Sequence, residues 1–150
     1  MARIRWRANV APMTVHIVKL CVGVDTIDDL IAWQNRLLRA NRAPYHHTRM
    51  MPKRAEDVLA GGSMYWVIKR AIRVRQRITA INELTDDGGR KFCELVFDPE
   101  IHPTYAQPRR PFQGWRYLKD EDIPRDLSAG EAAADIPIEL DMALKKAMVF

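Results

Sequence analysis

The densest group of residues able to bind a ligand lies between Arg109 and Leu118. Arginine forks suit phosphate groups, aromatic rings stack on unpaired bases, and a glutamine amide can read a base edge. Gly114 permits a close backbone approach or a positive φ. The ligand-binding residues predicted here are Arg110, Phe112, Gln113, Trp115, Arg116 and Tyr117. An alternative stays open, in which the aromatics close one end of the fold and the arginines pair with the acids after Asp120.

A second basic group lies on an alternating segment. Arg73, Arg75 and Arg77 fall on one side of an expected strand. The other side carries Ile72, Val74, Gln76 and Ile78. We predict that the three arginines and Gln76 contribute to the ligand-binding surface. A buried amide needs hydrogen-bond partners, so Gln76 has two open interpretations, a polar group on a pocket floor or a structural hydrogen bond.

The segment Thr48–Arg54 is a third candidate, and Arg49 is the residue predicted to bind ligand there. Its basic and methionine side chains can line the edge of the same pocket. They can equally cap the helix that follows.

The histidines and cysteines do not indicate a metal site. His46 and His47 are adjacent, whereas zinc ligands usually come in pairs two to five residues apart, and the chain has no Cys-x-x-Cys. Cys21 and Cys93 lie in expected strands, where cysteine is most often a small core residue. Gly61-Gly62 follows a helix instead of opening one, so it is not a phosphate loop. The sequence therefore predicts no metal, no cofactor and no catalytic residue.

Charge is unevenly spread along the 150 residues, whose formal net charge is +5. Between Arg49 and Arg77, eight Lys or Arg and two acids give a local +6. Between Asp120 and Asp141, eight acids and one arginine give −7. A chain polarised in this way can present a basic face to an anion. No apolar run approaches the length of a membrane-spanning helix, so we expect no membrane partner.

The first residues do not follow the pattern of a secretory signal, because the basic start is followed by a segment too short and too polar. We therefore expect a cytoplasmic protein with reduced thiols. We expect residues 1–12 to be a disordered extension and residues 13–150 to form a single domain. The oligomeric state is not predicted.

Periodicity and turn residues predict an α+β fold, a curled and mostly antiparallel sheet with two or three flanking helices. The expected strands are Val15–Val22, Met64–Ile68, Ala71–Leu84, Phe92–Phe97 and Trp115–Leu118. The expected helices are residues 27–40, a short one between Pro52 and Gly61, and Pro137–Val149. The expected irregular parts are a loop over 41–51, a bend or bulge at Lys69–Arg70, a hairpin turn at Asp86–Gly89, and loops over Asp98–Pro111 and Asp120–Asp135.

Several motifs resemble an uncharacterised alphaproteobacterial family of domains of unknown function. They are His16–Gly23, Thr48–Arg54, Gly61–Lys69, Arg75–Ile78 and Arg109–Leu118. The resemblance runs from about Met13 to Leu127. It implies very little about activity, because no function is assigned to that family.

A weaker resemblance is to the PUA superfamily, which includes the ASCH and EVE domains. There, too, a glycine-rich start leads into consecutive strands, as Gly61-Gly62-Ser63 leads into Tyr65–Ile68 here. The resemblance implies a small PUA-like barrel and an association with RNA or modified bases. It identifies no functional residue in this chain, and fold does not fix function.

Three functions remain open at this point. The first is binding of RNA or a modified nucleotide through the arginine and aromatic surface. The second is a small nucleotide-processing or hydrolytic enzyme, with Glu56, Asp57 and Glu94 as available acids. The third is a protein-interaction module. Because no acid–base pair stands out near the motifs, we favour binding over catalysis.

Overall fold

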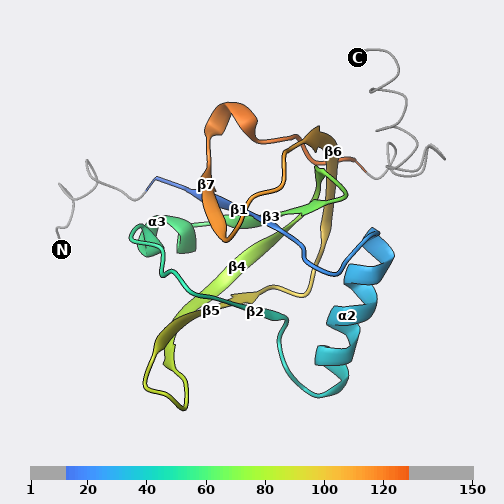
Figure 1. Ribbon diagram of the computed structural model, residues 1–150. Helices are drawn as coiled ribbons and strands as arrows, with labels where there is room; N and C mark the ends of the chain where they lie inside the picture. Colours follow the sequence, from blue (N-terminus) through green and yellow to red (C-terminus); the bar gives the residue numbers. More distant parts are fainter. Residues whose placement is uncertain (1–12, 129–150) are drawn as a thin grey trace, which may run out of the picture.

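The computed structural model describes residues 13–128, which form a curled, open sheet of seven strands with two helices (Figure 1). The strand order is β2-β5-β4-β3-β1-β7, and β6 pairs with β4. The strands are β1 (His16–Leu20), β2 (Tyr45–Thr48), β3 (Ser63–Ile68), β4 (Ala71–Thr85), β5 (Lys91–Phe97), β6 (His102–Pro108) and β7 (Trp115–Leu118). The helices are α2 (Ile27–Arg39) and α3 (Ala55–Leu59), and a 3-10 turn, η1, covers Asp120–Asp122. The predicted α+β class is confirmed.

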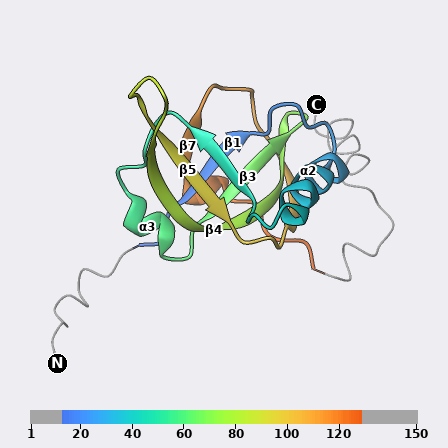
Figure 2. The same cartoon turned by 90° about the horizontal axis from the view of Figure 1, so that it is seen from below.

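All strand pairs are antiparallel except β1 with β3. Figure 2 shows how the long β4 curves and how α2 lies beside the curled sheet. None of the helices in the described part of the chain is long and apolar enough to cross a membrane. The expected helix Pro137–Val149, most of the expected acidic loop and residues 1–12 lie outside the described residues.

Helix α2 forms where the sequence predicts it, because its ends are well specified. Thr26 accepts a hydrogen bond from the Asp29 amide, and the Asp29 carboxylate accepts one from the Thr26 amide, which makes a capping box. Arg36 and Arg39 lie in the last turn, where cations suit the helix dipole. Leu30 and Gln34 are buried against the sheet.

The short helix α3 also ends at the position predicted from the two glycines that follow it. Gly61 has a φ of 100°, in the left-handed region that favours glycine. A Cβ at Gly62 would collide with the carbonyl oxygens of Val15 and Val58. The chain can therefore pass directly from α3 into β3 only with glycine at this position.

The prediction of a bend or bulge at Lys69–Arg70 is wrong. Both residues have positive φ, 51° and 67°, so they form a tight turn and the chain reverses there into an antiparallel hairpin. Such turns usually carry Asn or Gly, and neither residue type marks this one.

The β-bulge lies instead within β4, where the register shifts from Trp66↔Val74 to Val67↔Ile72. Arg73 is the extra residue, and it is buried with its Nε donating to the Ile68 carbonyl at 2.6 Å. The bulge interrupts the alternation, so the prediction that Ile72 shares a face with Val74 is also wrong.

The sheet has two apolar faces. The inner face carries the larger cluster, including Ile17, Met64, Trp66, Val74 and Ile78. The outer face carries a smaller cluster of Val18, Tyr65, Val67, Ile72 and Leu118, with Phe112 packed against it. The prediction that Trp66 and Ile68 face the core is confirmed.

Two strands lie where loops were expected. Strand β2 is a short polar edge strand paired only with β5, and it falls inside the expected loop 41–51. Strand β6 carries Pro103 and Pro108, and it pairs with β4 across the bulge. Proline is tolerated on edge strands because it donates no hydrogen bond to a neighbour.

Side chains close the curled sheet where β7 faces the segment after β2. The Trp115 Nε1 donates to the Met50 carbonyl at 2.7 Å, and the Tyr117 hydroxyl accepts from the Arg54 amide at 3.0 Å. We call this contact between residues 50–54 and β7 the seam.

Candidate functional site

A cavity of about 480 Å³ lies between α2 and the inner face of the sheet. The turn Val22–Val24 after β1 forms one edge. The aromatic lining residues are Trp33, His46 and Trp66, and the polar ones are Cys21, Asp29 and Arg36. We call this cavity the α2 pocket. Its volume is within the range usual for small-molecule sites.

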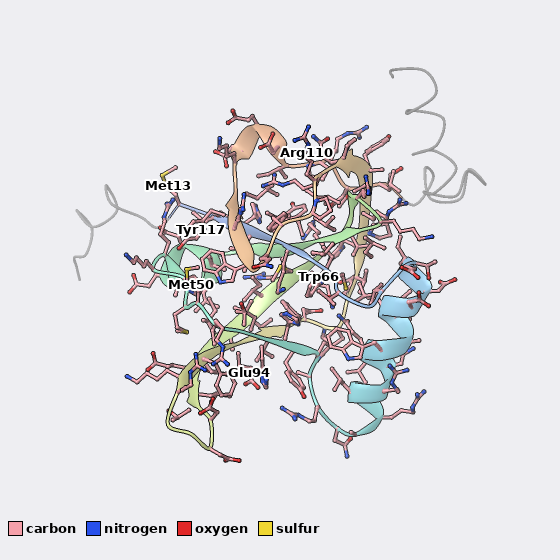
Figure 3. The ribbon with its side chains drawn as sticks, viewed as in Figure 1. Met13, Met50, Trp66, Glu94, Arg110 and Tyr117 are labelled. Atoms are coloured by element: carbon pink, nitrogen blue, oxygen red, sulfur yellow. The ribbon has the colours of Figure 1, made fainter. Side chains whose placement is uncertain are left out.

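The aromatic side chains give the α2 pocket one fixed wall. Trp66 is 1% exposed and lies in the interior (Figure 3). Its ring meets His46 edge-on at 5.5 Å between centroids and Phe97 at 5.6 Å. Trp33 is only partly buried, so its indole is the aromatic surface that a ligand can reach.

A buried pair of amides holds α2 in place. Gln34 and Gln76 each donate to the other's carbonyl oxygen at 2.7 Å. The Gln76 Oε1 also accepts from the Trp66 Nε1 at 3.0 Å. Of the two interpretations that the sequence left open for Gln76, the structure gives it the structural hydrogen bonds.

One lysine with a largely buried side chain lies near the pocket. Lys19 is 9% exposed, and burial lowers its pKa. Burial and the Lys19 charge lower the pKa of His46 to about 4, so this imidazole is neutral at pH 7. Burial raises the pKa of the Cys21 thiol to about 12, which argues against a thiolate nucleophile.

One of the residues that line the pocket, Arg36, carries a positive charge. Arg36 lies one turn after Trp33 on α2 and is exposed. Among residues 13–128, no carboxylate forms an ion pair with Arg36. In the same part of the chain, no group of three His, Cys, Asp or Glu side chains is placed to hold a metal.

Two of the arginines on the outer face, where the sequence predicts ligand binding, form ion pairs with acidic residues instead. Arg75 makes two hydrogen bonds to the Asp126 carboxylate, at 2.6 and 2.8 Å, which lower the pKa of Asp126. Arg109 pairs with Asp122 at 3.9 Å. The alternative in which arginines pair with the acidic segment is therefore confirmed for these two.

The predicted aromatics do not form an open stacking surface. Trp115 is 6% exposed on the inner face, and Tyr117 stacks edge-on against it at 4.9 Å. Phe112 packs on the outer cluster, with the Arg116 guanidinium 4.9 Å from its ring. The structure thus divides the predicted site residues between two faces of the sheet. Those that remain exposed are Arg49, Arg77, Arg110, Gln113 and Arg116.

Trp33 and Arg36, which line the pocket, and Lys19, which lies beside it, were not predicted as site residues. One signal was present: Lys19 interrupts an apolar run, Ile17–Val22, within the expected strand Val15–Val22. A lysine at a buried strand position is unusual unless it is paired or functional. The helix residues gave no comparable signal, because aromatic and basic side chains are common on amphipathic helices.

Comparison with known proteins places the chain in a family. Among solved structures, the chain is similar to a crystal structure of a mutant ASCH protein from Zymomonas mobilis, with 10% identity, a TM-score of 0.47, and coverage of 74% of this chain and 93% of that one. A search of curated proteins found no match. The family model described as "Protein of unknown function (DUF1489)" matches residues 17–150. The expected resemblance to a domain family of unknown function is confirmed, and the chain belongs to the DUF1489 family.

Proposed function

We propose that this domain binds a nucleotide, either free or as an unpaired residue of an RNA, with its base in the α2 pocket. The observation that carries the proposal is the pairing of Trp33 and Arg36 on one face of α2, at the edge of a cavity large enough for a base. An accessible indole stacks on any base, and an adjacent guanidinium suits a phosphate.

The chemistry of the pocket wall is also suited to a base edge. His46 is neutral at pH 7, so its imidazole offers one hydrogen-bond donor and one acceptor. Trp66 lies behind it with its Nε1 already bonded to Gln76, so it contributes a rigid apolar floor. Because Gln34 and Gln76 fix α2, the pocket is formed before any ligand binds.

The base is placed in the α2 pocket and not on the segment Arg109–Leu118, because the Trp115 ring is buried and its Nε1 donates to the Met50 carbonyl. The exposed arginines of the outer face stay a prediction. If they act, we expect Arg77, Arg110 and Arg116 to contact the backbone of a longer RNA.

The test is the binding of a fluorescently labelled single-stranded RNA at low and moderate salt. Trp33→Ala should weaken binding about tenfold, because base stacking contributes ~1–3 kcal/mol. Arg36→Ala should weaken binding and reduce its salt dependence, by a slope of ~0.7 for each lost phosphate contact.

The matched control is Arg90→Ala, an exposed arginine in the turn between β4 and β5 that does not line the pocket. We expect its effect to be smaller than that of Arg36→Ala. Absence of binding by the wild type at low salt, or equal binding by the wild type and Trp33→Ala, would overturn the proposal.

A further inference from the structure

Resting on that proposed function, we propose that Lys19 reads an oxo group on the buried edge of the base, so that the α2 pocket selects uracil- and guanine-type bases over cytosine and adenine.

Lys19 lies on the inner face of the sheet, beside the α2 pocket, next to residues that line it. On β1 it precedes Cys21 by two residues, so both side chains fall on the inner face. In the parallel register it lies directly beside Trp66. Cys21 and Trp66 both line the pocket, and the Lys19 charge acts on the His46 imidazole, which lines it as well. Lys19 is thus a neighbour of three of the lining residues, although it is not itself one of them.

The charge of Lys19 is not balanced by the protein around it. Within the described range 13–128, no carboxylate forms an ion pair or a hydrogen bond with this ammonium. The titratable neighbours His46 and Cys21 are both neutral at pH 7. A lysine whose side chain is largely buried and has no carboxylate partner favours a site where a ligand supplies acceptor oxygens.

Lysine offers three donors and no acceptor, so it discriminates between base edges. A carbonyl oxygen, such as O4 of uracil or O6 of guanine, accepts from it. The exocyclic amino groups of cytosine and adenine are donors and would face the ammonium donor to donor.

His46 completes the pattern. In uracil and guanine, the carbonyl oxygen adjoins a ring N–H. The neutral imidazole of His46 can accept that proton while Lys19 donates to the oxygen. Cytosine and adenine present the reverse order, an amino donor beside a ring-nitrogen acceptor. A donor from Lys19 and an acceptor from His46 therefore match only the oxo bases.

The experiment compares the affinities of UMP, CMP, GMP and AMP by isothermal titration calorimetry. We expect the wild type to prefer UMP over CMP, and GMP over AMP, by about tenfold in each pair, as expected for a two-point contact with a base edge. Lys19→Met should lower the affinity for UMP and GMP to that for CMP and AMP, whereas Lys19→Arg should keep part of the preference. The control is Lys53→Met, an exposed lysine outside the pocket, which should change none of the four affinities.

The outcomes separate this inference from the proposed function. Equal affinity of the wild type for all four nucleotides overturns the inference and leaves nucleotide binding intact. No binding of any nucleotide, together with no binding of RNA, overturns the proposed function itself. An unchanged preference in Lys19→Met, with its fold checked by circular dichroism, shows that Lys19 does not read the base. Should that variant fail to fold, the wild-type ratios and Lys19→Arg still decide the matter.

Discussion

The side-chain amides of Gln34 and Gln76 form a reciprocal buried pair, in which each Nε2 donates to the other's Oε1 at 2.7 Å. Gln34 belongs to α2 and Gln76 to β4, so the pair joins the helix to the centre of the sheet. The Gln76 amide also donates to the Asp98 carbonyl at 3.2 Å. These bonds set the position of α2, and with it the position of Trp33 and Arg36 at the pocket.

Replacing only one glutamine of this pair should lower the free energy of unfolding by more than half of the loss caused by replacing both. Gln76→Leu should lower the free energy of unfolding by about 2–4 kcal/mol, because it leaves the Gln34 amide and the Trp66 N–H buried without acceptors. In the double variant Gln34→Leu/Gln76→Leu, the loss should be clearly smaller than the sum of the two single losses. Urea denaturation of the four proteins measures this coupling. Additive losses would contradict the pairing.

The seam should depend on two side-chain hydrogen bonds. Tyr117→Phe removes the acceptor of the Arg54 amide and should lower stability by about 0.5–1.5 kcal/mol. Trp115→Phe removes the donor to Met50 and part of the packing, and should cost about 1–3 kcal/mol. Thermal unfolding measures both. Unchanged melting temperatures would show that other contacts close the sheet.

The Trp66 ring should be one of the most costly side chains to truncate. It is 1% exposed, contacts His46 and Phe97, and donates to Gln76. Trp66→Ala should lower the free energy of unfolding by about 3–5 kcal/mol. Met50→Ala is a suitable comparison, because Met50 is 60% exposed; it should change stability by less than about 0.5 kcal/mol. Similar effects of the two substitutions would refute the assigned facing of β3.

Stability should fall as the pH is lowered from 7 to 5. The folded-state pKa of His46 is about 4, below the value of about 6.5 expected in the unfolded chain, so the unfolded state binds more protons in this range. After allowance for its partial exposure, His46 should account for about 1–2 kcal/mol of the loss. The pKa of His16 is also lowered by burial and contributes in the same direction. His46→Asn should flatten the dependence measured by urea denaturation, and an unchanged slope would contradict the burial of His46.

Elements with local signals could be predicted from the sequence. The capping residues Thr26 and Asp29 define α2, Gly61 and Gly62 end α3, and Asp86–Gly89 turns the β4–β5 hairpin. Each depends on residues close together in the chain. This is why these elements lie close to where the sequence predicts them.

Elements that depend on distant partners could not be predicted. Strand β2 forms because β5 offers it an edge, although its own residues are polar. The turn at Lys69–Arg70 uses residues that rarely adopt positive φ, so only the pairing of β3 with β4 reveals it. The bulge at Arg73 then interrupts the expected alternation.

The candidate site shows the same limit. The motif Arg109–Leu118 combines residues suited to RNA, but the fold uses Trp115 and Tyr117 at the seam and pairs Arg109 with Asp122. Residue types alone do not distinguish a ligand surface from a closing contact. The α2 pocket joins residues from the turn after β1 with residues of β2, β3 and α2, so only the tertiary structure brings them together.

The most direct test of nucleotide binding in the α2 pocket is an amide chemical-shift map of the ¹⁵N-labelled protein titrated with UMP. We predict the largest shifts at Gly23, Trp33 and His46, including the Trp33 indole N–H, with little change at Arg110, Gln113 and Arg116. Shifts confined to the outer face from Arg109 to Arg116, or no shifts at millimolar UMP and GMP, would contradict the account.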